Sequence, residues 1–342
     1  MNPRPTIALL LALFLAVAAR ADLCAVRDLE LVPDDPTVDN GAILTAAIRD
    51  GRVNDGIDFP GGAYYATSTV DDRSKEGLAF TGQGLTHWNV PGAYRHPTTG
   101  QPQRRGNASV RWIYRGPAEQ PAWRISGYGT RIQGINIWRG SPGKAKLLAQ
   151  WGSDEAPSTG IEFVKGGGPP AGKWSVDHVS FAGFGRAVHF ADSTNVDSSD
   201  FGYLRFVHCR TCIDADNMQT TCLGFGHVAV YGRGETVFDV SAGGNFQVGI
   251  LELIGPRLIW LFRRTGSNVS TFQVMHTKID NNAAGWRLVE QTGPGPLWLR
   301  MPFGEIGNKA TPGERPIVTR DYMGRAPRID VDLVGDDKLK AN

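Results

Sequence analysis

The stretch that decides the fold consists of three similar segments, VSFAGFGRAVHF (179–190), LRFVHCRTCIDA (204–215) and VAVYGRGETVFDV (228–240). Each segment holds two short strings rich in β-branched and aromatic residues, with glycine or polar residues between them. Strings of this kind favour short β-strands. Matching strings recur about 25 residues apart. A period of this size predicts stacked units that bury one shared core.

The repeat continues toward the C-terminus. Further strings of the same kind lie at 251–253, 258–262, 272–279, 297–301 and 329–333. Leucine-rich repeats have a similar period, but their spacing of leucine and asparagine is missing from this sequence. The repeat therefore predicts a β-solenoid whose coils occupy about 125–335.

A short amphipathic helix is predicted ahead of the first strands. Asp39 or Asn40 can cap its N-terminus, and Gly51 ends it. A strand, a Pro-Gly-Gly turn and a second strand follow over 57–65, and another strand over 78–84. The apolar face of the helix is formed by Ile43, Leu44, Ala47 and Ile48.

This opening resembles the N-terminal cap of the pectate-lyase-like right-handed parallel β-helix superfamily. The residues that carry the resemblance are the helix after Asp39, IDFPGGAY (57–64) and FTGQG (80–84). The resemblance implies an all-β, right-handed parallel β-helix with a short N-terminal capping helix. It implies no single activity, because this superfamily contains lyases, hydrolases, esterases, epimerases, tailspikes and non-enzymatic surface proteins.

The resemblance and the repeat together predict one β-helix domain over 22–335. Its expected parts are a cap (22–85), a basic-aromatic loop region (86–124) and the coils (125–335), followed by a polar tail (336–342). With 342 residues, of which 41% are hydrophobic, the chain is neither disordered nor a disulfide-rich miniprotein. Its 43 glycines suit a protein with many turns.

Residues 1–21 have the pattern of a secretory signal. Arg4 precedes an apolar run over 7–19, and Ala19-Arg20-Ala21 offers a small-x-small cleavage site. A lone N-terminal anchor is the alternative. We expect a secreted protein, extracellular or periplasmic, with no membrane partner after cleavage. Removal of Arg4 and Arg20 leaves 34 basic and 34 acidic residues, which argues against a nucleic-acid partner.

Export places the cysteines in an oxidising compartment, where disulfides form. We expect Cys222 to pair with Cys209 or Cys212, leaving Cys24 outside that pair. A zinc site is the alternative, because Cys209 and Cys212 have C-x-x-C spacing, but only His208 and His227 offer further ligands nearby.

The repeat also predicts a column of polar side chains on the outside of the solenoid. His189, Asp214 and Asp239 lie 25 residues apart, each between apolar neighbours that point inward. Stacked carboxylates beside a histidine can transfer protons, because like charges raise one pKa. They can also hold Ca²⁺ as a cofactor. The alternative is a solvated polar ladder. Arg263 or Arg264, and then Arg287, are expected to continue the column.

A second feature is the basic and aromatic stretch 86–131. Arginine forks bind carboxylate or sulfate groups, and aromatic faces stack on sugars, so an acidic polysaccharide is the expected partner. The alternative is solvated charge with cap packing. The candidate substrate-binding residues are Trp88, Tyr94, Arg95, Arg104, Arg105, Arg111 and Trp112.

The sequence therefore predicts a secreted carbohydrate-active protein. It is expected to act as a polysaccharide lyase or glycoside hydrolase on a uronic or sulfated glycan, with Asp214, Asp239 and His189 as the catalytic residues. The pattern of pectin hydrolases is matched only faintly, because Ala215 splits the Asp pair and a valine follows His227. The alternative function is a non-catalytic β-helix that binds a surface glycan or a protein.

Overall fold

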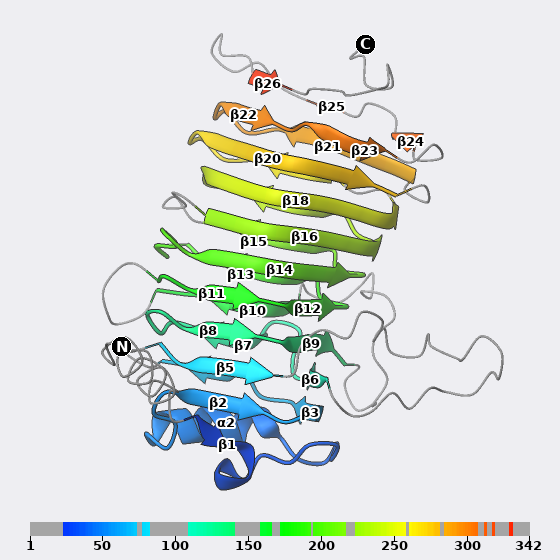
Figure 1. Ribbon diagram of the computed structural model, residues 1–342. Helices are drawn as coiled ribbons and strands as arrows, with labels where there is room; N and C mark the ends of the chain where they lie inside the picture. The colour runs from blue at the N-terminus through cyan, green and yellow to red at the C-terminus, as the bar shows by residue number, and fades with distance from the viewer. Residues whose placement is uncertain are drawn as a thin grey trace, which may run out of the picture.

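The computed structural model describes residues 23–73, 77–82, 109–140, 158–165, 172–192, 194–216, 223–257, 260–280, 284–306, 311–312, 317–318 and 328–330. Short strands stack one above another from β1 at the N-terminal end to β26 at the C-terminal end (Figure 1). Every strand pair that the structure describes is parallel. The fold is the parallel β-helix that the repeat predicts.

The strands form two parallel sheets, which we call sheet A and sheet B. Sheet A contains the longest strands, which belong to the later coils. Its strands are β1 (Cys24–Ala25), β2 (Gly56–Phe59), β3 (Gly62–Ala66), β5 (Ala79–Gly82), β6 (Val110–Tyr114), β8 (Arg131–Gln133), β9 (Ile135–Arg139), β11 (Ser175–Asp177), β12 (Val179–Ala182), β14 (Asp200–Val207), β16 (Leu223–Arg233), β18 (Gly244–Arg257), β20 (Ser270–Ile279), β22 (Leu297–Arg300), β23 (Phe303–Ile306), β24 (Thr311–Pro312) and β26 (Arg328–Asp330).

Sheet B is narrower and carries the polar column. Its strands are β4 (Val70–Asp72), β7 (Pro121–Ile125), β10 (Thr159–Phe163), β13 (Arg186–Phe190), β15 (Thr211–Ala215), β17 (Thr236–Val240), β19 (Trp260–Arg264), β21 (Ala284–Gln291) and β25 (Ile317–Val318).

The 25-residue register is confirmed on both sheets. On sheet A, Val179 pairs with Leu204, and Leu204 pairs with Val228. On sheet B, Val188 pairs with Ile213, and Ile213 with Phe238. Equivalent positions on successive coils therefore point the same way, either into the core or out to solvent.

The core is built from ladders of like residues. Phe246 stacks on Phe272 with ring centroids 4.7 Å apart and planes 11° apart. Phe238 stacks on Phe262 at 5.6 Å and 14°. Parallel strands lie about 4.8 Å apart, so identical inward positions on neighbouring coils bring aromatic rings into stacking contact.

A capping helix closes the N-terminal end. Helix α2 (Asn40–Arg49) follows a 3₁₀ turn, η1 (Val26–Leu29), and contacts β3 and β4 at the N-terminal end of the stack (Figure 1). The Asp39 side chain accepts hydrogen bonds from the amides of Gly41 and Ala42, which satisfies the first turn. The same carboxylate accepts hydrogen bonds from the Thr67 and Ser68 hydroxyls and thereby ties the helix to the end of β3.

The cysteines form no disulfide in the described part of the chain. Cys24, Cys209 and Cys212 are free thiols, and Cys222 lies outside the described residues. Cys209 and Cys212 are buried in the core, and burial raises the pKa of Cys209 to about 12. The expected pairing of Cys222 with one of these thiols is not shown and stays a prediction.

Among the described residues, no helix is both long and apolar enough to cross a membrane. The signal-like residues 1–21 lie outside that part of the chain.

Candidate functional site

The predicted polar column lies on the outer face of sheet B. His189 on β13 pairs with Asp214 on β15, and Asp214 pairs with Asp239 on β17. The next positions are Arg263 on β19 and Glu290 on β21. The expectation of Arg263 is therefore confirmed. The alternative, Arg264, is fully buried and not in this column. The expectation that Arg287 comes next is wrong, because Glu290 holds that place and Arg287 pairs with Trp260 in a neighbouring column.

The column also extends toward the N-terminus. Glu162 on β10 pairs with His189, and Arg124 on β7 pairs with Glu162. The Arg124 Nε donates to Glu162 Oε2 at 2.9 Å. Arg124 belongs to the basic stretch 86–131, so one residue of that stretch does join the column.

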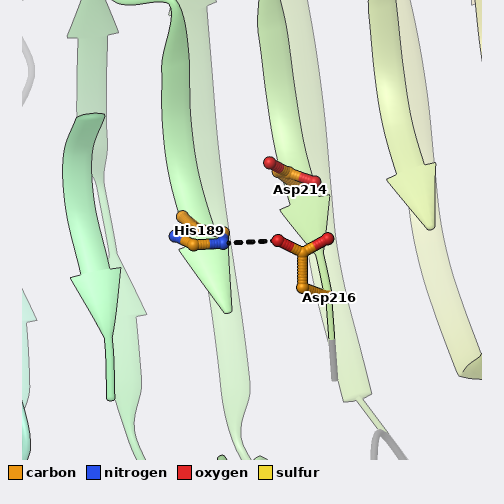
Figure 2. A group of neighbouring side chains, drawn as sticks. All are labelled: His189, Asp214 and Asp216. Atoms are coloured by element: carbon orange, nitrogen blue, oxygen red, sulfur yellow. Dashed lines mark hydrogen bonds and ion pairs between the residues drawn. The ribbon is translucent and has the colours of Figure 1, made fainter. Parts of the chain in front are cut away.

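His189 lies between two carboxylates. Its Nε2 is 3.0 Å from Asp216 Oδ2, and its Nδ1 is 3.4 Å from Glu162 Oε1. Asp216 follows directly after β15 and points back toward the imidazole, as Figure 2 shows. The Ser241 hydroxyl donates to the other oxygen of Asp216 at 2.6 Å. The His189 side chain is only 7% exposed, whereas that of Asp216 is 38% exposed and reachable from solvent.

Asp214 lies beside this pair and is held by an arginine. Arg186 NH1 is 3.3 Å from Asp214 Oδ2 and also 3.3 Å from His189 Nε2. One ligand atom from each of His189, Asp214 and Asp216 falls within 4.8 Å of the others. The side chain of Asp214 is 13% exposed, so it is mostly shielded yet reaches the surface.

The surroundings shift the pKa values of Asp214, on β15, and Asp216, directly after it, in opposite directions. Burial raises the pKa of Asp214 to about 6, and the negative charge of Asp216 adds to that rise. The hydrogen bond from His189 lowers the pKa of Asp216, and the Ser241 hydroxyl lowers it further. At mildly acidic pH, one carboxyl is therefore a proton donor beside an ionised neighbour.

The surroundings of His189 favour its charged form. Burial by itself lowers the pKa of an imidazole, but hydrogen bonds to Asp216 and Glu162 outweigh it and raise the pKa of His189. The positive charge of Arg186 opposes that rise without reversing it. In turn, the hydrogen bond from His189 lowers the pKa of Glu162 to about 2, with help from Arg124.

These charges fit proton transfer better than calcium binding. Ca²⁺ needs six to eight oxygen ligands. Here the carboxylates of Asp214 and Asp216 already face the Arg186 guanidinium and the His189 imidazole. A metal ion would have to displace both groups, so the donor set does not suit the calcium site that the sequence left open.

Asp239 has a different environment from the one expected of a catalytic partner. Arg263 Nε donates to Asp239 Oδ2 at 3.0 Å, and Arg263 NH2 contacts the same oxygen. The carboxylate that lies beside Asp214 and His189 is instead Asp216. Asp216 could have been found from the sequence, because residues two apart on a strand point to the same face.

Three further residues of the cluster had no usable sequence signal. Glu162 lies 27 residues before His189, and Arg124 lies 38 residues before Glu162, so neither follows the 25-residue period. Arg186 precedes His189 by three residues, and its contact with Asp214 depends on the path of β13.

Five of the seven expected sugar-binding residues fall in the part of the chain that the structure does not describe, so their role stays a prediction. Trp88, Tyr94, Arg95, Arg104 and Arg105 lie outside the described residues. Arg111 lies on β6 in sheet A, where its NH2 is 3.7 Å from Asp34.

The prediction that Trp112 contacts a sugar is wrong. Its side chain is fully buried, because its position on β6 faces inward. There it stacks on Tyr64 at 6.2 Å and meets Trp123 edge-on at 5.0 Å. Trp112 is therefore a core residue that no glycan can reach in this fold.

A separate polar cluster lies on sheet A. His227 Nε2 is 3.2 Å from Glu252 Oε2, and Lys278 Nζ is 3.3 Å from the other oxygen of Glu252. The ring of Tyr203 meets that of His227 at 4.8 Å. Since His227 is on a different sheet from Asp214, the faint pectin-hydrolase order in the sequence does not converge on one site.

Replacing Glu162 with Gln is expected to weaken the fold at neutral pH by about 1–3 kcal/mol. The lowered pKa of Glu162 means that its ionised form stabilises the folded state. This contribution is present above pH 4.5 and is lost as the pH falls toward about 2. Urea unfolding of both proteins should show the gap closing over that range, and NMR titration should show a lower pKa for His189.

The matched control is Glu119→Gln, at an exposed glutamate before β7. Glu119→Gln should leave both the free energy of unfolding and the pKa of His189 unchanged. A difference in unfolding free energy for Glu162→Gln that stays constant down to pH 2 would refute the assigned role of Glu162.

Comparison with known proteins gives no family. No protein-family model matches the sequence, and no curated protein matches it. Among solved structures, one likeness is the enzymatically active domain of tailspike protein 2 of bacteriophage CBA120, with a TM-score of 0.49 and 8% identity. The match covers 84% of this chain and 43% of that one, so the chain spans less than half the length of the tailspike domain.

Proposed function

We propose that the chain is a glycoside hydrolase that cleaves a polysaccharide on the outer face of sheet B. One observation carries this proposal. Two carboxylates lie side by side, and their surroundings raise the pKa of Asp214 to about 6 and lower that of Asp216. Glycosidases use such a pair, with one carboxylic acid and one carboxylate at the scissile bond.

The reaction follows from the protonation states. Asp214 donates its proton to the glycosidic oxygen as the bond to the anomeric carbon breaks. Asp216 stays ionised and faces the positive charge that develops on the sugar. Water adds at the anomeric carbon, and its proton returns to the carboxylate pair. His189 is a positioning residue, because its Nε2 lies 3.0 Å from the Asp216 carboxylate and holds it in place.

Hydrolysis suits this cluster better than β-elimination. A lyase must neutralise the substrate's carboxylate with cations and remove a proton with a base. The described cations Arg124, Arg186 and Arg263 are each already in contact with a protein carboxylate. Both ring nitrogens of His189 already face protein carboxylates, those of Asp216 and Glu162, so neither is directed at a substrate proton.

Export and the acidic nature of the substrate are part of the same proposal. The secretory pattern of residues 1–21 supports a protein that meets its polysaccharide outside the cytoplasm. The arginines of the stretch 86–131 support an acidic glycan.

Activity is expected to fall as the pH rises through about 6. The acid must be protonated to act, and burial together with the charge of Asp216 places the pKa of Asp214 at about 6. Above this point each further pH unit should lower the rate about tenfold. The test measures the release of reducing ends from a panel of polysaccharides between pH 4 and pH 8. A rate that stays level up to pH 8 contradicts the assignment of Asp214 as the acid.

A further inference from the structure

The outer face of sheet B is almost fully charge-paired. Three of its described arginines contact carboxylates on the same face: Arg124 with Glu162, Arg186 with Asp214, and Arg263 with Asp239. A face whose cations are already neutralised has little remaining attraction for an acidic substrate. If the substrate is acidic, its acid groups need a cation that lacks a protein partner.

Arg287 is that cation. Within the described part of the chain it forms no ion pair, and its position on β21 faces outward beside Trp260 on β19. The guanidinium carbon lies 5.0 Å from the centroid of the Trp260 ring, which holds it by a cation–π contact. Both side chains are partly exposed. The charge is therefore positioned but not neutralised.

The pair lies in line with the catalytic cluster. The register column of this pair begins at Arg186, whose guanidinium contacts Asp214, and passes through the buried Thr211 and Thr236 to the partly exposed Trp260 and Arg287. Neighbouring parallel strands are about 4.8 Å apart, so Trp260 lies about 10 Å and Arg287 about 14 Å along the stack from Asp214. That spacing per strand is close to the length of one sugar unit.

We propose that Arg287 and Trp260 form a subsite for an anionic sugar, two to three units from the bond cleaved at Asp214. A guanidinium offers two parallel donors that match a carboxylate or sulfate group. The polysaccharide then runs along the stack of strands, with an acidic unit at Arg287 and the scissile bond at Asp214. This inference rests on the proposed function and adds the site that selects an acidic substrate.

The test compares binding of matched glycans to Arg287→Gln. Affinity electrophoresis in gels containing polygalacturonate, carboxyl-reduced polygalacturonate or chondroitin sulfate reports affinity without any need for cleavage. We expect Arg287→Gln to lose about tenfold or more in affinity for whichever acidic glycan the wild-type protein binds, and to be unchanged toward the carboxyl-reduced glycan. The matched control is Arg300→Gln, an exposed arginine on β22 of sheet A, which should bind like the wild type.

Each outcome decides the proposal. Unchanged affinity of Arg287→Gln for acidic glycans overturns it, and so does a wild-type protein that binds none of the acidic probes. Equal losses for acidic and reduced glycans also overturn it, because the residue would then not sense charge. Binding that depends on Arg287 without any cleavage would leave the subsite intact and reject the hydrolase. If the wild-type protein cleaves a glycan, and Arg287→Gln changes neither that cleavage nor the affinity, the subsite is rejected and the hydrolase is kept.

Discussion

Replacing Asp214 with Asn is expected to slow glycan hydrolysis by about 10²- to 10⁴-fold while the protein stays folded. The amide has nearly the same shape as the carboxylic acid but cannot supply its proton to the leaving oxygen. Loss of an ionisable group that is mostly buried should cost no stability at neutral pH, because burial disfavours the ionised form of Asp214. Initial rates of reducing-end release, with thermal unfolding as a check on folding, measure the two effects separately.

Two other aspartates make this result specific. Asp200→Asn, at an exposed position on β14 of sheet A, should keep the wild-type rate. Asp239→Asn should retain more activity than Asp214→Asn, because Asp239 is engaged with Arg263 rather than with the acid pair. Full activity in Asp214→Asn, or equal losses in all three variants, would exclude Asp214 as the proton donor.

Replacing Trp112 with Ala is expected to destabilise the fold by about 3–5 kcal/mol. The indole is fully buried and contacts both Tyr64 and Trp123, so its removal leaves a large cavity between the first coils. Urea unfolding measures the loss. Glycan affinity of the protein that remains folded should match the wild type, because the residue has no exposed surface.

The matched control is Trp298→Ala on β22, where the tryptophan is 51% exposed. We expect Trp298→Ala to lower the free energy of unfolding by much less than Trp112→Ala does, because a smaller apolar area of this side chain is buried in the fold. Similar stabilities for Trp112→Ala and the wild type would mean that Trp112 is not part of the core.

The fold was predictable because the repeat is regular where the chain has no long insertion. Equivalent positions from Val179 through Leu204 and Val228 to Leu251 follow one register, and alternation along each strand then decides which residues face outward. That logic correctly placed His189, Asp214, Asp239 and Arg263 in one column.

The other residues of the site could not be predicted from the 25-residue repeat. The segment between β9 and β10 breaks the spacing, so Arg124 could not be aligned with Glu162 from residue counts, and the 27 residues from Glu162 to His189 also differ from the period. Ion pairs also determine the role of each carboxylate, and residue spacing does not reveal them. Asp239 is paired with Arg263, and Asp216 is the carboxylate grouped with Asp214 and His189. Trp112 shows a further limit, because an aromatic residue near arginines in the sequence can equally belong to the core.

The central claim is that the Asp214 and Asp216 pair hydrolyses a glycan. Its most direct test incubates the purified protein with acidic and neutral polysaccharides, with and without calcium, and follows reducing ends and the ultraviolet absorbance of unsaturated sugar ends together. We predict reducing ends without that absorbance, independent of calcium and lost in Asp214→Asn. Products that absorb in the ultraviolet, or no product from a folded protein that still binds a glycan, would contradict the claim.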